Sequence, residues 1–135
     1  WPAGILDTPF ALTNVVPITH LSPVPGSLVM PKKYKYKSDR HPMFYRDVVK
    51  KGFDSFIFRN QYNEANLDLL ENTPEEILGM VKEMNARIDG TWVASPEDEE
   101  LHRQFWSIFP PGHPAYGCPA RIPIDFLKRN RELIM

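Results

Sequence analysis

Residues 73–90 read TPEEILGMVKEMNARIDG, and this stretch carries the strongest local signal in the chain. Thr73 is a favourable helix N-cap, and Pro74 suits the first helical position, where its missing N–H does no harm. Glu76 stands where its carboxylate can reach back and close a capping box. Gly90 follows at the place where a left-handed residue commonly ends a helix. The pattern therefore predicts a helix that begins after Thr73 and stops at Gly90.

The apolar residues of this stretch recur at helical spacing. They are Ile77, Val81, Met84 and Ile88. That spacing places them on one face, which we expect to be buried. The stretch Ser95-Pro96-Glu97-Asp98 repeats the start signal and predicts a second helix. Its expected inner face comprises Leu101, Phe105 and Ile108.

Towards the N-terminus the chain alternates between helix and strand signals. Residues 1–7 predict the last turns of a helix, residues 10–16 predict a buried strand between prolines, and residues 28–30 predict a second short strand. The segment 17–26, with its three prolines and a glycine, predicts a shaped loop. This order of elements favours an α/β fold with a parallel sheet.

The middle and the end of the chain hold shorter signals. Residues 32–37 alternate lysine with tyrosine, which is typical of a solvated edge or loop and alternatively of a phosphate-facing cluster. Ser38 or Asp39 is expected to cap a helix that stops at Gly52. Further predictions are a short strand at 53–59, a small helix at 63–72, a loop at 113–119 and a final helix at about 124–133. The last helix is expected to present Phe126, Leu127, Leu133 and Ile134.

Composition limits the class of protein. The 135 residues are 42% hydrophobic and 24% charged, with a net charge of −1, which suits one globular domain with a real core and no nucleic-acid surface. A single cysteine excludes an internal disulfide and favours a reducing, cytoplasmic setting. The sequence shows no signal peptide and no apolar run that predicts a transmembrane segment. Because the chain starts in mid-pattern at Trp1, we expect residues 1–135 to be a single domain from the C-terminal part of a longer protein.

Motifs for self-contained catalysis are missing from the sequence. The four histidines, at positions 20, 41, 102 and 113, include no i, i+4 pair with a carboxylate partner, so we expect no metal site. The sequence contains neither a nucleophile elbow nor a phosphate-binding glycine loop. A self-contained hydrolase or kinase is therefore not supported.

Polar residues gather where the early strands end. The candidate ligand-binding residues are Thr13, Asn14, His20, Lys32 and Lys33, with Thr19 and Ser22 beside them. In open α/β sheets ligands bind outside the carboxyl ends of the strands, and the two lysines suit a diphosphate. A plain strand-end turn or a loop histidine bonded to a backbone carbonyl explains the same residues without a ligand, and both alternatives stay open.

Five stretches carry a resemblance to a known family. They are ILDTPFALTNVVP (5–17), SLVMPKKY (27–34), RDVVKKG (46–52), LLENTPEEILGMVKEMNARIDGTWVASPEDEELHRQFW (69–106) and ARIPIDFLKRNREL (120–133). Together they resemble the C-terminal region of a bacterial family of glycosyltransferases associated with surface carbohydrates and the two-domain GT-B arrangement. The most specific parts are PFALTN, NTPEEI and the GTW…EDEEL…FW segment.

The resemblance implies a partial or small Rossmann-like domain: a short parallel sheet, several packed helices and a helix-rich C-terminal half. It implies the donor-side portion of a glycosyltransferase, which moves a sugar from a nucleotide-sugar to a glycan acceptor without a cofactor. Its partners would then include a missing N-terminal domain, and a homo-oligomer is left open. The alternatives are a fragment inactive on its own and a non-catalytic interaction module. The module would use the aromatic residues Trp1, Trp92, Trp106, Tyr34 and Tyr36.

Overall fold

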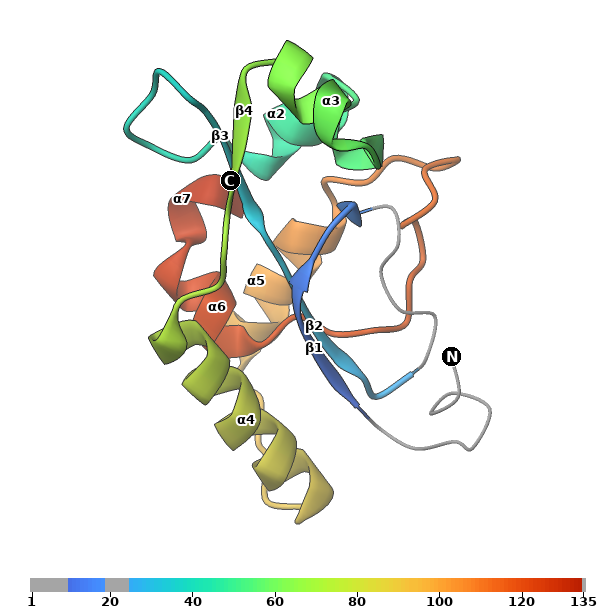
Figure 1. Cartoon of the computed structure of the whole chain (residues 1–135). Coiled ribbons are helices and arrows are strands. Elements are labelled where there is room, and N and C mark those ends of the chain that lie inside the picture. The colour runs from blue at the N-terminus through green and yellow to red at the C-terminus, as the bar shows by residue number, and fades with distance from the viewer. Residues whose placement is uncertain (1–9, 19–24, 135) are drawn as a thin grey trace.

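The computed structural model describes residues 10–18 and 25–134 of the chain. It is a mixed α/β arrangement in which two short strand pairs are accompanied by helices (Figure 1). The α/β class expected from the sequence is thereby confirmed at this coarse level. The helix predicted at 1–7 lies outside the described residues.

The first strand pair is parallel, as predicted. Strand β1 (Ala11–Val15) pairs with β2 (Leu28–Pro31), and an isolated parallel bridge joins Leu28 to Arg121. Strand β3 (Lys33–Tyr36) follows β2 almost directly and pairs antiparallel with β4 (Leu67–Leu70). Because only Lys32 separates these two strands, the continuous path from β2 into β3 connects the two sheets (Figure 1).

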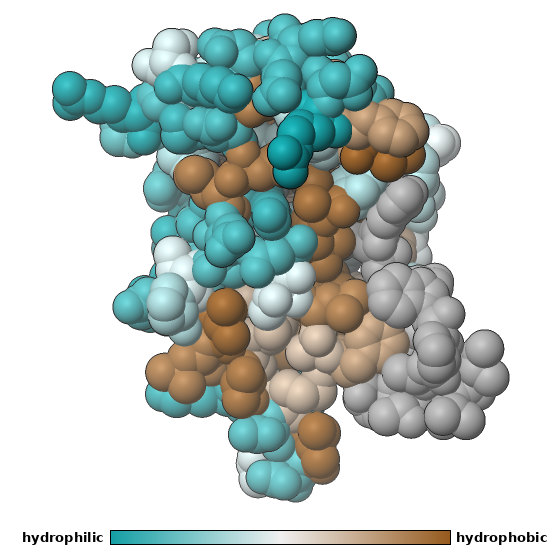
Figure 2. All heavy atoms as spheres, viewed as in Figure 1, coloured by the Kyte–Doolittle hydropathy of each residue, from teal (hydrophilic) through white to brown (hydrophobic). Residues whose placement is uncertain are grey.

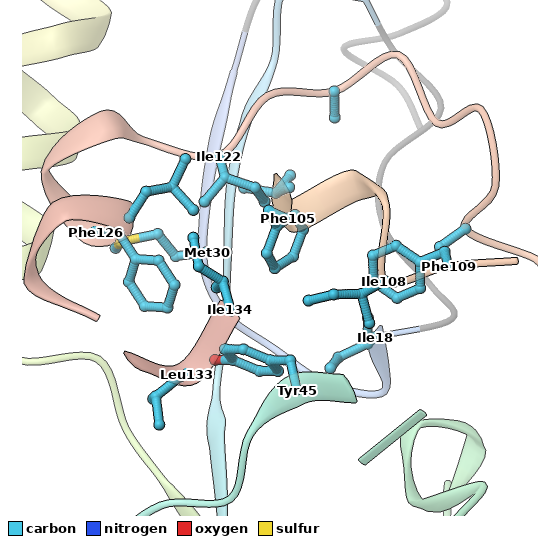
Figure 3. Close-up of a cluster of buried hydrophobic side chains, with 14 of the residues drawn as sticks. Ile18, Met30, Tyr45, Phe105, Ile108, Phe109, Ile122, Phe126, Leu133 and Ile134 are labelled. Atoms are coloured by element: carbon cyan, nitrogen blue, oxygen red, sulfur yellow. The ribbon is translucent and has the colours of Figure 1, made fainter. Parts of the chain in front are cut away.

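The core packs between β2 and the C-terminal helices, and Figure 3 shows its side chains converging. All four residues of β2 are buried, which suits an apolar parallel strand covered by helices. The covering elements are α5 (Pro96–Trp106), α6 (Ile124–Arg129) and α7 (Arg131–Ile134). The inner residues predicted for them are confirmed as buried: Leu101, Phe105, Ile108, Phe126, Leu127, Leu133 and Ile134.

Both predicted capping boxes are present. Thr73 Oγ1 accepts the N–H of Glu76 at 3.2 Å, and Glu76 accepts the N–H of Thr73 at 2.9 Å, at the start of α4 (Pro74–Ile88). Ser95 and Asp98 exchange the same two bonds at 3.0 Å each at the start of α5. These local signals were readable because a capping box involves only neighbouring residues.

The predicted buried face of α4 is only partly right. Ile77 and Met84 are half-buried and pack against the core. Val81 is 45% exposed and Ile88 is 67% exposed, whereas the helix buries Glu76, Met80 and Glu83. At 100° per residue, the buried side lies about 100° around the helix from the apolar stripe. Apolar side chains accordingly gather on the outer surface over α4 (Figure 2).

The physical reason is that each buried glutamate has partners that no local pattern reveals. Glu83 accepts hydrogen bonds from the Arg87 guanidinium and from the Ile124 N–H at the start of α6, both at 2.8 Å. Gly79 lies between the two glutamates and lets α6 approach closely, because a Cβ there would stand 2.6 Å from the Asp125 carboxylate.

Two further predictions are wrong around residues 53–72. Residues Phe53–Ser55 form a short 3-10 helix, η2, instead of a strand, and α3 spans Arg59–Glu64. The leucines predicted to lie on a helix belong to β4. Asn66 adopts a left-handed φ of 60° after α3, and the following residues extend because they pair with β3. That pairing is non-local, so it overrode the helical pattern.

The neighbouring segments also differ from expectation. Helix α2 (Tyr45–Lys50) begins after an extended Phe44 instead of at Ser38 or Asp39, because Pro42 disfavours helical backbone in the residue before it. Residues 33–36 form a strand of a two-stranded sheet, so the edge alternative holds and the loop alternative does not, although Tyr34 is fully buried and not solvated. The final helix is divided in two at Asn130. Within residues 10–18 and 25–134, no helix combines the length and apolarity needed to cross a membrane.

Candidate functional site

The carboxyl end of β1 departs from regular strand geometry. Leu12 pairs with Val29 and Val15 pairs with Pro31, so β1 carries one extra residue there, a β-bulge. Asn14 supplies the left-handed backbone, with φ of 54°, and asparagine tolerates that conformation better than most residues. Bulges re-aim side chains and are over-represented beside active sites.

The bulge is fixed by a second asparagine. The Asn14 N–H donates to Asn72 Oδ1 at 2.5 Å, and the Asn72 N–H donates to Asn14 Oδ1 at 2.7 Å. Asn72 also donates from its side chain to the Pro31 carbonyl at 3.0 Å. This reciprocal pair ties the ends of β1 and β2 to the residue that precedes the cap of α4. Thr13 adjoins it within β1.

Lys32 reaches the same edge of the sheet. Its N–H donates to the Val15 carbonyl at 3.1 Å, and its carbonyl accepts the Tyr45 hydroxyl at 3.0 Å. In the described part of the chain its ammonium takes part in no ion pair. The structure therefore brings Thr13, Asn14 and Lys32 together, as the sequence predicted. His20, with Thr19 and Ser22, lies outside the described residues.

Lys33 is placed differently. Its ammonium lies 2.9 Å from the Glu76 carboxylate, with the Lys33 side chain 14% and the Glu76 side chain 2% exposed. Asn130 donates to the same Glu76 oxygen at 2.8 Å. Burial alone would raise the pKa of Glu76, but the bonds from Thr73, Asn130 and Lys33 outweigh it, so the pKa is lowered. The charge of Lys33 is thus balanced internally.

The N-terminus of α4 also offers little to an anion, because groups of the chain itself already occupy it. Its cap residue and Glu76 satisfy each other's N–H groups, and Pro74 has none. Glu75 and Glu76 also place negative charge in its first turn. Of the candidate phosphate contacts at this edge, Lys32 is the one that remains available.

A hollow of about 310 Å³ opens beside the end of β1; we call it the β1-end hollow. It lies against Val16, Pro17, Phe56, Arg59, Tyr62 and Asp68, among others. The loop before α3 is held because Gln61 Oε1 accepts the N–H groups of Ile57 and Phe58, both at 2.9 Å. No ion pair of Arg59 occurs within residues 10–18 and 25–134.

Sequence reasoning missed this hollow because residues 53–59 were interpreted as a strand. The available signal was the density of aromatic residues between positions 53 and 62, interrupted by Arg59 and Gln61. A strand would have directed those side chains to alternate faces. The 3-10 turn and α3 instead pack Phe53, Phe56 and Tyr62 against one another, while Phe58 stays exposed.

Two of the described histidines, His102 and His113, are engaged in structural bonds, whereas His41 is exposed. His113 accepts the Ala115 N–H at 3.0 Å on Nδ1 and bonds to buried Asp54 through Nε2. His102 Nε2 accepts from Trp106 at 3.0 Å and from the Ile122 N–H at 3.3 Å, and burial lowers the pKa of His102 to about 4. His102 is therefore neutral at neutral pH. Across the residues that the structure describes, no group of three metal-ligating side chains is found.

Comparisons with protein-family models, with curated proteins and with solved structures found no match to this chain. The site is therefore interpreted from its own geometry: a bulged strand end, one available lysine and an adjoining aromatic hollow.

Proposed function

We propose that the chain is the donor-side portion of a glycosyltransferase, which holds a nucleotide-sugar while its sugar moves to a glycan acceptor. One observation carries the proposal. The hydrogen bond from the Lys32 N–H to the Val15 carbonyl joins the ends of two parallel strands, where an open α/β sheet keeps its ligand. The resemblance of five sequence stretches to such enzymes points the same way.

The chemistry of the reaction suits the groups at this edge. As the bond between sugar and diphosphate breaks, negative charge grows on the leaving diphosphate, and cationic or N–H donors stabilise it. Lys32 supplies an ammonium that no described carboxylate neutralises, and Arg59 lies at the adjoining hollow. Lys33 stabilises the fold through Glu76 and takes no direct part.

The interaction-module alternative loses its support from the contacts of its aromatic residues. Tyr34 is fully buried, and the Trp106 ring packs 5.2 Å from Phe105. Trp92 lies under the Arg87 guanidinium at 5.1 Å. Tyr36 packs on Phe53, and Trp1 lies outside the described residues. Because the four described rings already make contacts within the fold, we do not propose that function.

Calorimetric titration of the 135-residue chain with UDP and with ADP tests the proposal. At least one of the two should bind, and Lys32→Ala should weaken its binding about tenfold, since a charge-assisted contact is worth about 1.5–3 kcal/mol and this one is partly solvated. The matched control is Lys82→Ala, an exposed lysine on α4. His20→Ala is measured in parallel.

The proposal predicts unchanged binding for Lys82→Ala. Equal affinity of the wild type and Lys32→Ala would remove Lys32 from the site. A chain that binds neither diphosphate, although folded by circular dichroism, would refute donor binding by this region.

A further inference from the structure

We infer that the β1-end hollow is a binding site for a flat aromatic ring, and that its ring is the base of the nucleotide held at the neighbouring sheet edge. That the ring belongs to a nucleotide base rests on the proposed function. That the hollow binds a flat aromatic ring rests on the hollow alone.

The hollow lies beside the middle of a run of packed aromatic rings. The run passes from Tyr36 to Phe53 (6.2 Å between centroids), to Phe56 (5.5 Å), to Tyr62 (5.5 Å) and to Tyr34 (6.4 Å). Phe56 and Tyr62 meet edge to face at 84° and both line the hollow. A further ring placed there would pack against these two rings, and stacking of a base on an aromatic side chain is worth about 1–3 kcal/mol.

The aromatic wall is held in place before any ligand arrives. The Tyr62 hydroxyl donates to the Phe56 carbonyl at 2.5 Å, which fixes the ring against its own loop. Gln61 clamps the same loop through Ile57 and Phe58. A preorganised wall loses little conformational entropy on binding, so the stacking energy is retained.

The polar groups at the hollow suit a heterocycle better than a hydrocarbon ring. Arg59 provides donors and Asp68 provides an acceptor, while Val16, Pro17 and Leu69 form apolar walls. Lys35 lies 3.6 Å from the Asp68 carboxylate, whose side chain is still 47% exposed, so Asp68 remains accessible. A base carries carbonyl acceptors and N–H donors around an apolar face, which matches this combination.

The volume of the hollow indicates which part of the ligand it can hold. A hollow of about 310 Å³ lies at the lower end of the range of roughly 300–1,000 Å³ for small-molecule sites. It accommodates a base and not an entire nucleotide-sugar. Val16 adjoins Val15, whose carbonyl accepts the Lys32 N–H. A base in the hollow therefore leaves the diphosphate beside Lys32.

The test follows backbone amide shifts by NMR while the full chain is titrated separately with UDP, uridine and inorganic pyrophosphate. UDP and uridine should shift amides around Tyr62 and Asp68, and pyrophosphate should not. Tyr62→Leu, which keeps apolar volume but removes the ring, should weaken UDP at least about fivefold, the equivalent of 1 kcal/mol. Pyrophosphate binding should be unchanged. Tyr62→Phe keeps the ring but loses the bond to the Phe56 carbonyl, so it should bind UDP more tightly than Tyr62→Leu does, and Tyr116→Leu is the control at an exposed tyrosine.

The outcomes separate the two proposals. UDP binding that tracks pyrophosphate and ignores Tyr62→Leu would overturn the base site while leaving diphosphate binding intact. Uridine shifts at the hollow without pyrophosphate binding would support the ring site and contradict the donor function. Shifts confined to the other hollow, beside Phe44 and Lys51, or no binding of any probe, would overturn the inference.

Discussion

Replacing Glu76 by glutamine should destabilise the fold far more than a neutral, nearly isosteric change usually does. The buried carboxylate accepts three bonds: from the Thr73 N–H at 2.9 Å, from Lys33 at 2.9 Å and from Asn130 at 2.8 Å. The amide oxygen of glutamine can keep the first. Its NH₂ group would then face the ammonium of Lys33 and the amide of Asn130, which are also donors.

The magnitude follows from the two bonds lost. Hydrogen bonds to charged groups contribute about 1.5–3 kcal/mol each, so two give about 3–6 kcal/mol. The 14% exposure of Lys33 allows partial hydration of the orphaned ammonium, which lowers the figure. We expect a loss of about 3–5 kcal/mol, the range for removing one partner of a buried ion pair.

Urea unfolding at pH 7, followed by tryptophan fluorescence, measures this loss. The matched control is Glu75→Gln, the exposed neighbour in the same first turn, for which the helix dipole predicts at most about 1 kcal/mol. If Glu76→Gln loses no more stability than Glu75→Gln, the reasoning about the buried pair is refuted.

The pH dependence supplies a second readout with a defined sign. Because the folded-state pKa of Glu76 is lowered from its ordinary value of 4.5, the native carboxylate holds its proton less tightly than the unfolded one. The stability that this shift provides is complete above about pH 4.5 and is lost as the pH falls through the folded-state pKa. The stability difference between wild type and Glu76→Gln should therefore shrink below pH 4.5.

Two further predictions test the placement of α4. Gly79→Ala, normally stabilising in a helix by about 1 kcal/mol, should here destabilise by about 1–3 kcal/mol because its Cβ would meet the Asp125 side chain, Cβ included, at 2.6–2.7 Å; a raised melting temperature would contradict the close approach of α6. Ile88→Ala should cost under about 1 kcal/mol because Ile88 is 67% exposed, whereas Phe105→Ala should cost about 3–5 kcal/mol; similar losses in urea unfolding would show that α4 faces the other way.

Local signals predicted the elements whose determinants are local. The caps at Thr73 and Ser95 use residues three positions away, and the apolar face of α5 packs on the core as its spacing indicates. The parallel pairing of β1 with β2 was also predicted, since it follows from the order of elements. The helix predicted at 63–72 was wrong because residues 67–70 are extended by their pairing with β3, which is distant in the sequence.

The candidate site was predicted in part, for the same reason. The position of Asn14 and Lys32 at one sheet edge follows from strand direction alone. The neutralisation of Lys33 could not be foreseen, because Glu76 is 43 positions away in the sequence and its predicted role was confined to the cap of its own helix. Arg59 and Tyr62 were missed because the hollow exists only after α3 folds back against β4.

The orientation of α4 has a consequence for how this helix is held. Glu76 and Glu83 lie about 10 Å apart along the helix and bond to α6 at opposite ends, through Asn130 and the Ile124 N–H. Because the folded-state pKa of Glu76 is lowered, acid strong enough to protonate this carboxylate weakens its bonds to Lys33 and Asn130. Acid should therefore loosen the attachment of the first turn of α4, which directly follows the Asn72 that fixes the bulge of β1.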